Sequence, residues 1–127
     1  MFTRRLVLAA AAAFAFAVPA FAADMTFTPD ALAAAQAANK SILVDISATW
    51  CPTCKAQAPI IQKLSADDKF KDLVILRVDF DSQKDVVRAL GANSQSTLIC
   101  FKGAKETARS VGDTDPASIE TLLAAAL

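Results

Sequence analysis

The stretch SILVDISATWCPTCK, Ser41–Lys55, decides the fold. It begins with a short apolar run, Ser41–Ser47, which has the length and the β-branched content of a buried strand. Cys51 and Cys54 follow directly, where a helix is expected to begin. Two cysteines at positions i and i+3 of a helix start lie on one face and can close a small disulfide ring. The unpaired backbone N–H groups of the first helical turn also stabilise a thiolate at the first cysteine.

This layout is typical of a thiol–disulfide active site, with Cys51 as the nucleophile and Cys54 as the resolving thiol. A CxxC motif also occurs in zinc sites and in structural disulfides. The chain has no histidine, and its only other cysteine is Cys100, so a four-ligand Cys/His site within one chain is excluded. A site with carboxylate ligands, or one shared between subunits, stays open. The lack of histidine also excludes Ser-His-Asp and Cys-His catalysis, and we favour redox chemistry.

The N-terminus has the pattern of a secretory signal peptide. The basic pair Arg4-Arg5 precedes the apolar run Leu6–Val18, and small residues suit cleavage after Ala22. We therefore expect a signal peptide over residues 1–22 and one domain over residues 23–127, located in a bacterial periplasm. A retained membrane anchor is the alternative. The twin-arginine route is the less favoured export pathway, because the residues after the arginines match its signal poorly.

The charge balance limits the kinds of partner that we expect, and the surroundings of the third cysteine indicate its role. The chain has 13 basic and 13 acidic residues, and this balance gives no reason to expect nucleic acid or an anionic surface as a partner. After signal cleavage we expect a monomer with no membrane attachment. The third cysteine, Cys100, lies in the apolar run Thr97–Phe101, so a small core side chain is favoured over a third reactive thiol.

The mature chain alternates helices and strands. The expected elements are a helix over Pro29–Asn39, a strand over Ser41–Ser47, a helix over Cys51–Ser65, a strand over Leu73–Asp79, a helix over Ser82–Leu90, strands over Ser96–Phe101 and Glu106–Gly112, and a last helix from Pro116 to the C-terminus. The first two strands are joined through a helix and should be parallel, whereas the last two should form an antiparallel hairpin. An α/β fold with a mixed central sheet between helices is predicted.

The chain resembles the thioredoxin superfamily over its mature length. The matching residues are Ile42–Asp45, Trp50-Cys51-x-x-Cys54-Lys55, Pro59, Val78-Asp79, Gly91, Thr97, Phe101–Gly103 and Val111-Gly112. This resemblance implies a thioredoxin-like three-layer α/β/α fold with four to five strands, including an extra strand at Met25–Phe27. It also implies protein thiol/disulfide clients, a redox-recycling partner, and no cofactor besides the redox-active Cys51–Cys54 disulfide.

The resemblance assigns further roles around the cysteines. Asp45 matches the family's buried acid, whose pKa should be raised by burial and which should move a proton to or from Cys54. The alternative is a carboxylate satisfied by local hydrogen bonds. The lysine that pairs with this acid in many thioredoxins falls on Ile75, so Asp45 should be more easily protonated here. Trp50 is expected to cover the disulfide and contact substrate, with a plain core tryptophan as the alternative.

One position departs from the family. Thioredoxins have a cis-proline that faces the cysteines, and that position is Ser96 here. A cis bond before a residue other than proline costs about 2.5–4 kcal/mol, so a trans Gln95–Ser96 peptide is predicted. In the family this loop pairs with the substrate backbone and shields the cysteines from metal. Gln95 and Ser96 are therefore candidate substrate contacts, together with Pro52 and Thr53 between the cysteines.

The sequence thus predicts a periplasmic thiol–disulfide oxidoreductase that acts on protein clients. The Pro52-Thr53 pair resembles that of reducing periplasmic thioredoxin-like proteins, so a reductant or exchanger is favoured. Two alternatives from other classes remain. One is a client-binding module whose Cys51–Cys54 disulfide is structural, and the other is a metal or iron–sulfur site that bridges two subunits.

Overall fold

The computed structural model describes residues 12–13 and 22–127. The predicted signal peptide lies almost wholly outside the described residues and stays a prediction. The helices are α1 (Pro29–Ala37), α2 (Pro52–Ser65), the short 3-10 helix η1 (Asp68–Phe70), α3 (Lys84–Ala89) and α4 (Pro116–Ala124), and the strands are β1 (Ala23–Thr26), β2 (Ser41–Ser47), β3 (Val74–Asp79), β4 (Thr97–Lys102) and β5 (Lys105–Val111).

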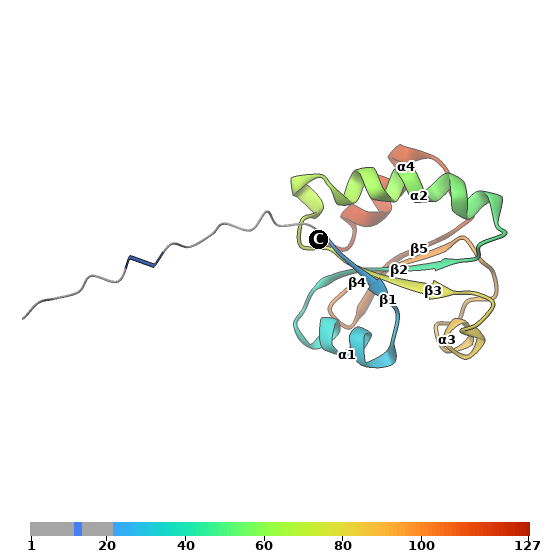
Figure 1. Cartoon of the computed structure of the whole chain (residues 1–127), viewed down its shortest axis with the longest axis horizontal. Coiled ribbons are helices and arrows are strands. Elements are labelled where there is room, and N and C mark those ends of the chain that lie inside the picture. Colours follow the sequence, from blue (N-terminus) through green and yellow to red (C-terminus); the bar gives the residue numbers. More distant parts are fainter. Residues whose placement is uncertain (1–11, 14–21) are drawn as a thin grey trace, which may run out of the picture.

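One five-stranded sheet in the order β1-β3-β2-β4-β5 forms the middle layer. Strand β3 runs parallel to both β1 and β2, and β4 runs antiparallel to both β2 and β5. Helices α2 and α4 cover one face of the sheet, and α1 and α3 cover the other (Figure 1). The predicted three-layer α/β/α fold with a mixed sheet is therefore confirmed, including the extra N-terminal strand. Within residues 22–127 no helix combines the length and apolar character that crossing a membrane requires.

Strand β2 lies at the centre of the sheet, and both of its faces are buried. Ile42, Val44 and Ile46 pack in the core beneath α1 and α3. Leu43 packs on the opposite face, in the core beneath α2 and α4. Because side chains alternate along a strand, Asp45 points to this second face, toward α2. The central strand thus carries a carboxylate from the core toward the cysteine-bearing helix.

The helix boundaries differ from the predicted ones where turns compete with the helix. Helix α1 begins as expected, with Thr28 Oγ1 accepting the N–H of Ala31 at 3.0 Å. It ends before Asn39, because that residue adopts a left-handed φ of 53°. Helix α3 starts later than predicted, because Gln83 is held outside it. The Gln83 side chain accepts the N–H of Asp79 and donates to the carbonyl of Phe27, both at 3.0 Å.

Candidate functional site

The cysteine pair lies where the chain leaves β2 and enters α2. Cys51 is the N-cap of α2, with an extended backbone, and its sulfur accepts the backbone N–H of Cys54 at 3.1 Å. The thiol therefore takes the place that a serine or aspartate oxygen usually has at a helix start. Pro52 occupies the first helical position, where its fixed φ suits the turn and its missing N–H costs nothing. All three cysteines are free thiols, so the structure describes the reduced protein.

The two thiols of the motif differ in acidity. Burial raises the pKa of Cys51, but hydrogen bonds from the side chains of Cys54 and Ser96 and from the backbone N–H groups of Cys54 and Thr53 outweigh burial and leave this pKa below that of an ordinary thiol. The pKa of Cys54 is raised, first by burial and then by its side-chain hydrogen bond to Cys51. Cys51 is therefore the sulfur that ionises first, and Cys54 keeps its proton.

Cys51 is almost completely hidden from solvent. A nucleophile at a helix start is expected to be partly exposed, but only 1% of Cys51 is exposed, compared with 8% of Cys54. The side chain of Ser96 lies against it. Ser96 Oγ is 3.1 Å from the Cys51 sulfur and 3.2 Å from the Cys54 sulfur. The loop that the sequence placed opposite the cysteines therefore contacts both sulfurs directly.

The Ser96 loop has a trans peptide and a left-handed backbone. No cis peptide occurs among residues 22–127, which confirms the predicted trans Gln95–Ser96 bond, and Ser96 has a φ of 61°. Its carbonyl accepts the N–H of Gly112 at 3.0 Å and the Gln57 side chain at 3.3 Å. Gln57 also donates to the carbonyl of Asp113 at 2.8 Å. Helix α2 and the end of β5 thus hold the loop in place, and Gln95 beside it is half-buried.

Asp45 lies behind the disulfide motif. The residue is 3% exposed and lines a cavity of about 180 Å³ together with Cys54, Lys55 and Arg77. Burial raises the pKa of Asp45, the Arg77 guanidinium lowers it, and the nearby Asp24 carboxylate raises it, with a net rise. The predicted direction agrees, and its main cause is burial.

The expectation that Asp45 lacks a cationic partner is wrong. Arg77 Nη1 donates to Asp45 Oδ2 at 2.9 Å, and the register of β2 and β3 places these two residues opposite each other. Ile75, the position matched to the family's lysine, is buried in the core beneath α2 and α4. The same guanidinium makes two further hydrogen bonds to Asp24 on β1, at 2.8 and 2.9 Å. A half-exposed arginine thus links the buried acid to the edge of the sheet.

Three predicted contact residues face solvent beside the cysteines. Trp50 is 55% exposed, so the plain core tryptophan is excluded. Its indole N–H donates to Asp81 Oδ2 at 2.7 Å, which fixes the ring's edge. Pro52 is exposed and Thr53 is half-buried. These side chains give the rim of the site both apolar and polar surface that a protein client can contact.

The third cysteine has the properties of a core side chain and not those of a reactive thiol. Cys100 is fully buried, and burial raises its pKa to about 12. It pairs with Leu43 in the register of β2 and β4. The structure therefore places Cys100 in the core, as the sequence favoured.

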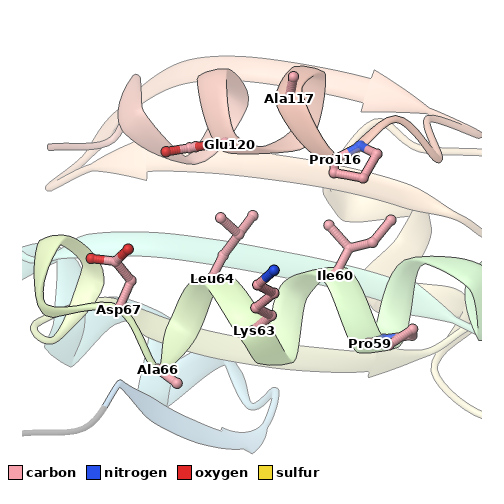
Figure 2. A pocket seen from close by; sticks show the side chains of 9 residues that line it. All are labelled: Pro59, Ile60, Lys63, Leu64, Ala66, Asp67, Pro116, Ala117 and Glu120. Carbon is pink, nitrogen blue, oxygen red and sulfur yellow. The ribbon is translucent and has the colours of Figure 1, made fainter.

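A separate groove lies between α2 and α4. It has a volume of about 760 Å³, and Figure 2 shows Ile60 and Leu64 of α2 pointing toward Pro116 and Ala117 of α4. No cysteine lines it. The groove and the cysteine pair are thus separate features of α2.

Sequence reasoning missed Arg77 and Gln57. Arg77 was visible as a single cation within an apolar strand, but its pairing with Asp45 depends on strand register. Gln57 was visible as a polar residue one turn after Cys54. Its contact with the Ser96 carbonyl depends on how the loop folds back over the helix. Both polar residues were therefore visible in the sequence, but the sequence did not show which residue each of them contacts.

Comparisons with known proteins agree with this geometry. The family model described as Thioredoxin matches residues 24–125. Thioredoxin-2 of Saccharomyces cerevisiae is 38% identical over 86 residues, which cover 68% of this chain and 80% of the yeast protein. A thioredoxin of Mycobacterium tuberculosis is 34% identical over 96 residues, covering 76% of this chain and 78% of the relative.

Solved structures agree as well. The crystal structure of Trxlp from Edwardsiella tarda EIB202 has a TM-score of 0.78 and 35% identity, and the match covers 80% of this chain and 98% of that one. The family model, the relatives and the fold together show that this chain belongs to the thioredoxin family of thiol–disulfide oxidoreductases.

Proposed function

We propose that the protein is an exported thiol–disulfide oxidoreductase that exchanges disulfides with protein clients through Cys51 and Cys54. The observation that carries this proposal is the asymmetry of the two sulfurs. The Cys51 sulfur receives hydrogen bonds that favour its thiolate, whereas Cys54 keeps its proton. An acidic nucleophile beside a protonated resolving thiol is the arrangement that two-step disulfide exchange requires.

The reaction begins at Cys51. Its thiolate attacks one sulfur of a client disulfide, and the other client sulfur leaves as a thiolate. The exposed Trp50 and Pro52 lie beside the nucleophile and offer contact surface to the client. Because only 1% of Cys51 is exposed, a client reaches the sulfur only after a local shift of the groups that cover it.

Cys54 completes the exchange. Once deprotonated, its sulfur attacks Cys51, releases the second client sulfur and leaves the Cys51–Cys54 disulfide. Asp45 is the candidate proton acceptor, because it lines the same cavity as Cys54 and its raised pKa brings it closer to the working pH. A separate redox partner must then reduce the pair.

We place the protein in the periplasm as a reductant or exchanger. The signal-peptide pattern of residues 1–22 supports export, and the Pro52-Thr53 dipeptide supports the reducing direction. Direction depends on the reduction potential of the pair. Expression of the full chain followed by fractionation tests the location: we expect a processed protein beginning at Ala23 in the periplasmic fraction. Unprocessed protein in the cytoplasm would contradict export.

The decisive experiment joins the reduction potential of the mature protein with an insulin-reduction assay. We expect insulin reduction with turnover, and a potential nearer the roughly −270 mV of thioredoxin than the roughly −120 mV of a strong oxidant. A potential near the oxidant's value would reverse the direction. If the Cys51–Cys54 disulfide resists reduction and insulin is not reduced, the client-binding alternative with a structural disulfide is favoured instead.

A further inference from the structure

A single hydroxyl group contacts both sulfurs of the motif. Ser96 Oγ lies 3.1 Å from the Cys51 sulfur and 3.2 Å from the Cys54 sulfur, and only 4% of Ser96 is exposed. A serine hydroxyl has one proton to donate and turns freely about its C–O bond. Because the two distances are nearly equal, rotation of the hydrogen alone moves the donated bond from one sulfur to the other.

The position of this hydroxyl is fixed by its surroundings. Ser96 has a left-handed φ of 61°, which is unfavourable for serine, and its hydroxyl lies against both sulfurs. The carbonyl of Ser96 is held by Gly112 and by the buried Gln57. Thr97 on the next position anchors the loop by donating to the carbonyl of Ser94 at 2.7 Å. The donor is thus preorganised before any client binds.

We propose that Ser96 is a catalytic residue whose hydroxyl donates a hydrogen bond to whichever cysteine sulfur carries the negative charge. The proposal rests on the disulfide exchange described above. In the reduced enzyme the hydroxyl donates to the Cys51 thiolate and accepts the Cys54 S–H. During the second step it donates to the Cys54 thiolate. A proline at this position has neither a hydroxyl nor a backbone N–H and does not supply such a bond.

The charges balance through both steps. Cys51 attacks a client sulfur, so one S–S bond forms, the client's S–S bond breaks, and its electron pair leaves with the departing thiolate. Cys51 is then neutral, and the Ser96 hydroxyl turns to Cys54. Cys54 gives its proton to Asp45, the candidate acceptor in the same cavity, and attacks Cys51, and the second client thiolate leaves. Two electrons pass from the cysteine pair to the client, whose thiolates take protons from water.

The acidity of the sulfurs agrees with this role. The hydrogen bond from Ser96 lowers the pKa of both Cys51 and Cys54. The other ionisable groups lining the cavity beside Cys54 are Asp45 on β2, Lys55 on α2 and Arg77 on β3. Substitution of Ser96 leaves all three unchanged, so a change in thiol acidity in a Ser96 variant reports on the hydroxyl.

The test uses two variants without the hydroxyl. Ser96→Ala keeps the side-chain carbon, and Ser96→Gly also relieves the left-handed backbone. The reduced protein is mixed with excess dithiobis(nitrobenzoate) in a stopped-flow instrument. The first release of chromophore reports the attack by Cys51, and the second reports resolution by Cys54. Cys100 is buried with a pKa of about 12 and stays silent in the folded protein.

We expect both variants to slow both phases by about tenfold, since a hydrogen bond to a charged group is lost. The pH midpoint of Cys51 alkylation, followed by mass spectrometry, should rise by about one unit. Ser94→Ala is the matched control. It removes a hydroxyl of the same loop that bonds the Gln95 carbonyl at 2.9 Å and does not touch sulfur, so both phases should keep their rates.

Two results would overturn the proposal. Unchanged rates and midpoints in both Ser96 variants would show that the hydroxyl has no catalytic part. Wild-type behaviour in Ser96→Gly with slow phases only in Ser96→Ala would assign the effect to backbone strain. A failure of the proposed function would look different: insulin would not be reduced by the wild-type protein, although both chromophore phases and their dependence on Ser96 remained.

Discussion

Two polar groups flank the cysteine pair, and they differ in almost every physical respect. Asp45 lies behind Cys54 and lines the same cavity as Cys54. It is ion-paired to Arg77 at 2.9 Å. Ser96 lies in front, is neutral, and touches both sulfurs. In the mechanism that we propose, the two groups have different tasks. The Ser96 hydroxyl contacts the sulfurs and stabilises negative charge on them, whereas the Asp45 carboxylate accepts a proton.

The largest effect should come from removing the sulfurs on which both groups act. Cys54→Ser should retain clients as mixed disulfides on Cys51, because the resolving step is gone, and Cys51→Ser should retain almost none. Insulin turnover should fall to background in both. Non-reducing gels of lysate bound to each variant check this. Equal retention by the two variants would contradict the assignment of nucleophile and resolving thiol.

Ser96→Pro tests the loop in front of the cysteine pair. Proline requires a φ near −65°, whereas Ser96 has a φ of 61°, so the loop cannot keep its shape. We expect the free energy of unfolding to fall by about 3 kcal/mol, together with loss of insulin reduction. Urea unfolding measures the first effect. A variant as stable as the wild type would mean that this loop readily accepts the family's proline geometry.

Asp45→Asn tests the side behind the disulfide. We expect the second chromophore phase to slow by about tenfold or more, because a proton acceptor is lost, while the first phase keeps its rate. The Ser96 variants should slow both phases, so the two patterns separate proton transfer from charge stabilisation. Equal slowing of both phases in Asp45→Asn would show that the carboxylate acts on Cys51 as well.

Asp45 also makes stability depend on pH. Because burial holds its pKa above that of the unfolded chain, the folded state binds the proton more readily. The stability of the wild type relative to Asp45→Asn should therefore be greatest below the unfolded pKa and decline as pH rises through the folded pKa. Urea unfolding over a pH series measures this difference. A difference that grows with rising pH would mean that Arg77 outweighs burial.

The smallest expected effect is a difference in stability between two substitutions of Ser96. Glycine usually destabilises a folded segment relative to alanine, but at a left-handed residue the order should reverse. We expect Ser96→Gly to be more stable than Ser96→Ala by about 1 kcal/mol, since neither has a hydroxyl and only glycine is unstrained. Thermal and urea unfolding of the two variants check this. The opposite order would mean that the loop relaxes in the alanine variant.

The sequence predicts the frame of this molecule better than its contacts. The bounds of β2, the helix after it and the burial of Cys100 all follow from local patterns of apolar residues. The pairing of Arg77 with Asp45 depends on the register between two strands, which neither strand specifies alone. The contact of Ser96 with both sulfurs depends on a backbone angle that a proline-based pattern does not describe. Contacts between residues that are distant in the sequence therefore do not follow from the periodic pattern of apolar residues.

The burial of Cys100 has a consequence for how this protein can misfold. The folded chain has an odd number of cysteines, yet its third thiol is fully buried in the core beneath α2 and α4, out of reach of an oxidant in solution. In an oxidising solution, wrong pairing of Cys100 with Cys51 or Cys54 is open only while the sheet is unformed. The speed of folding then decides the yield of correctly paired protein. Labelling of Cys100 would serve as a clock for global unfolding.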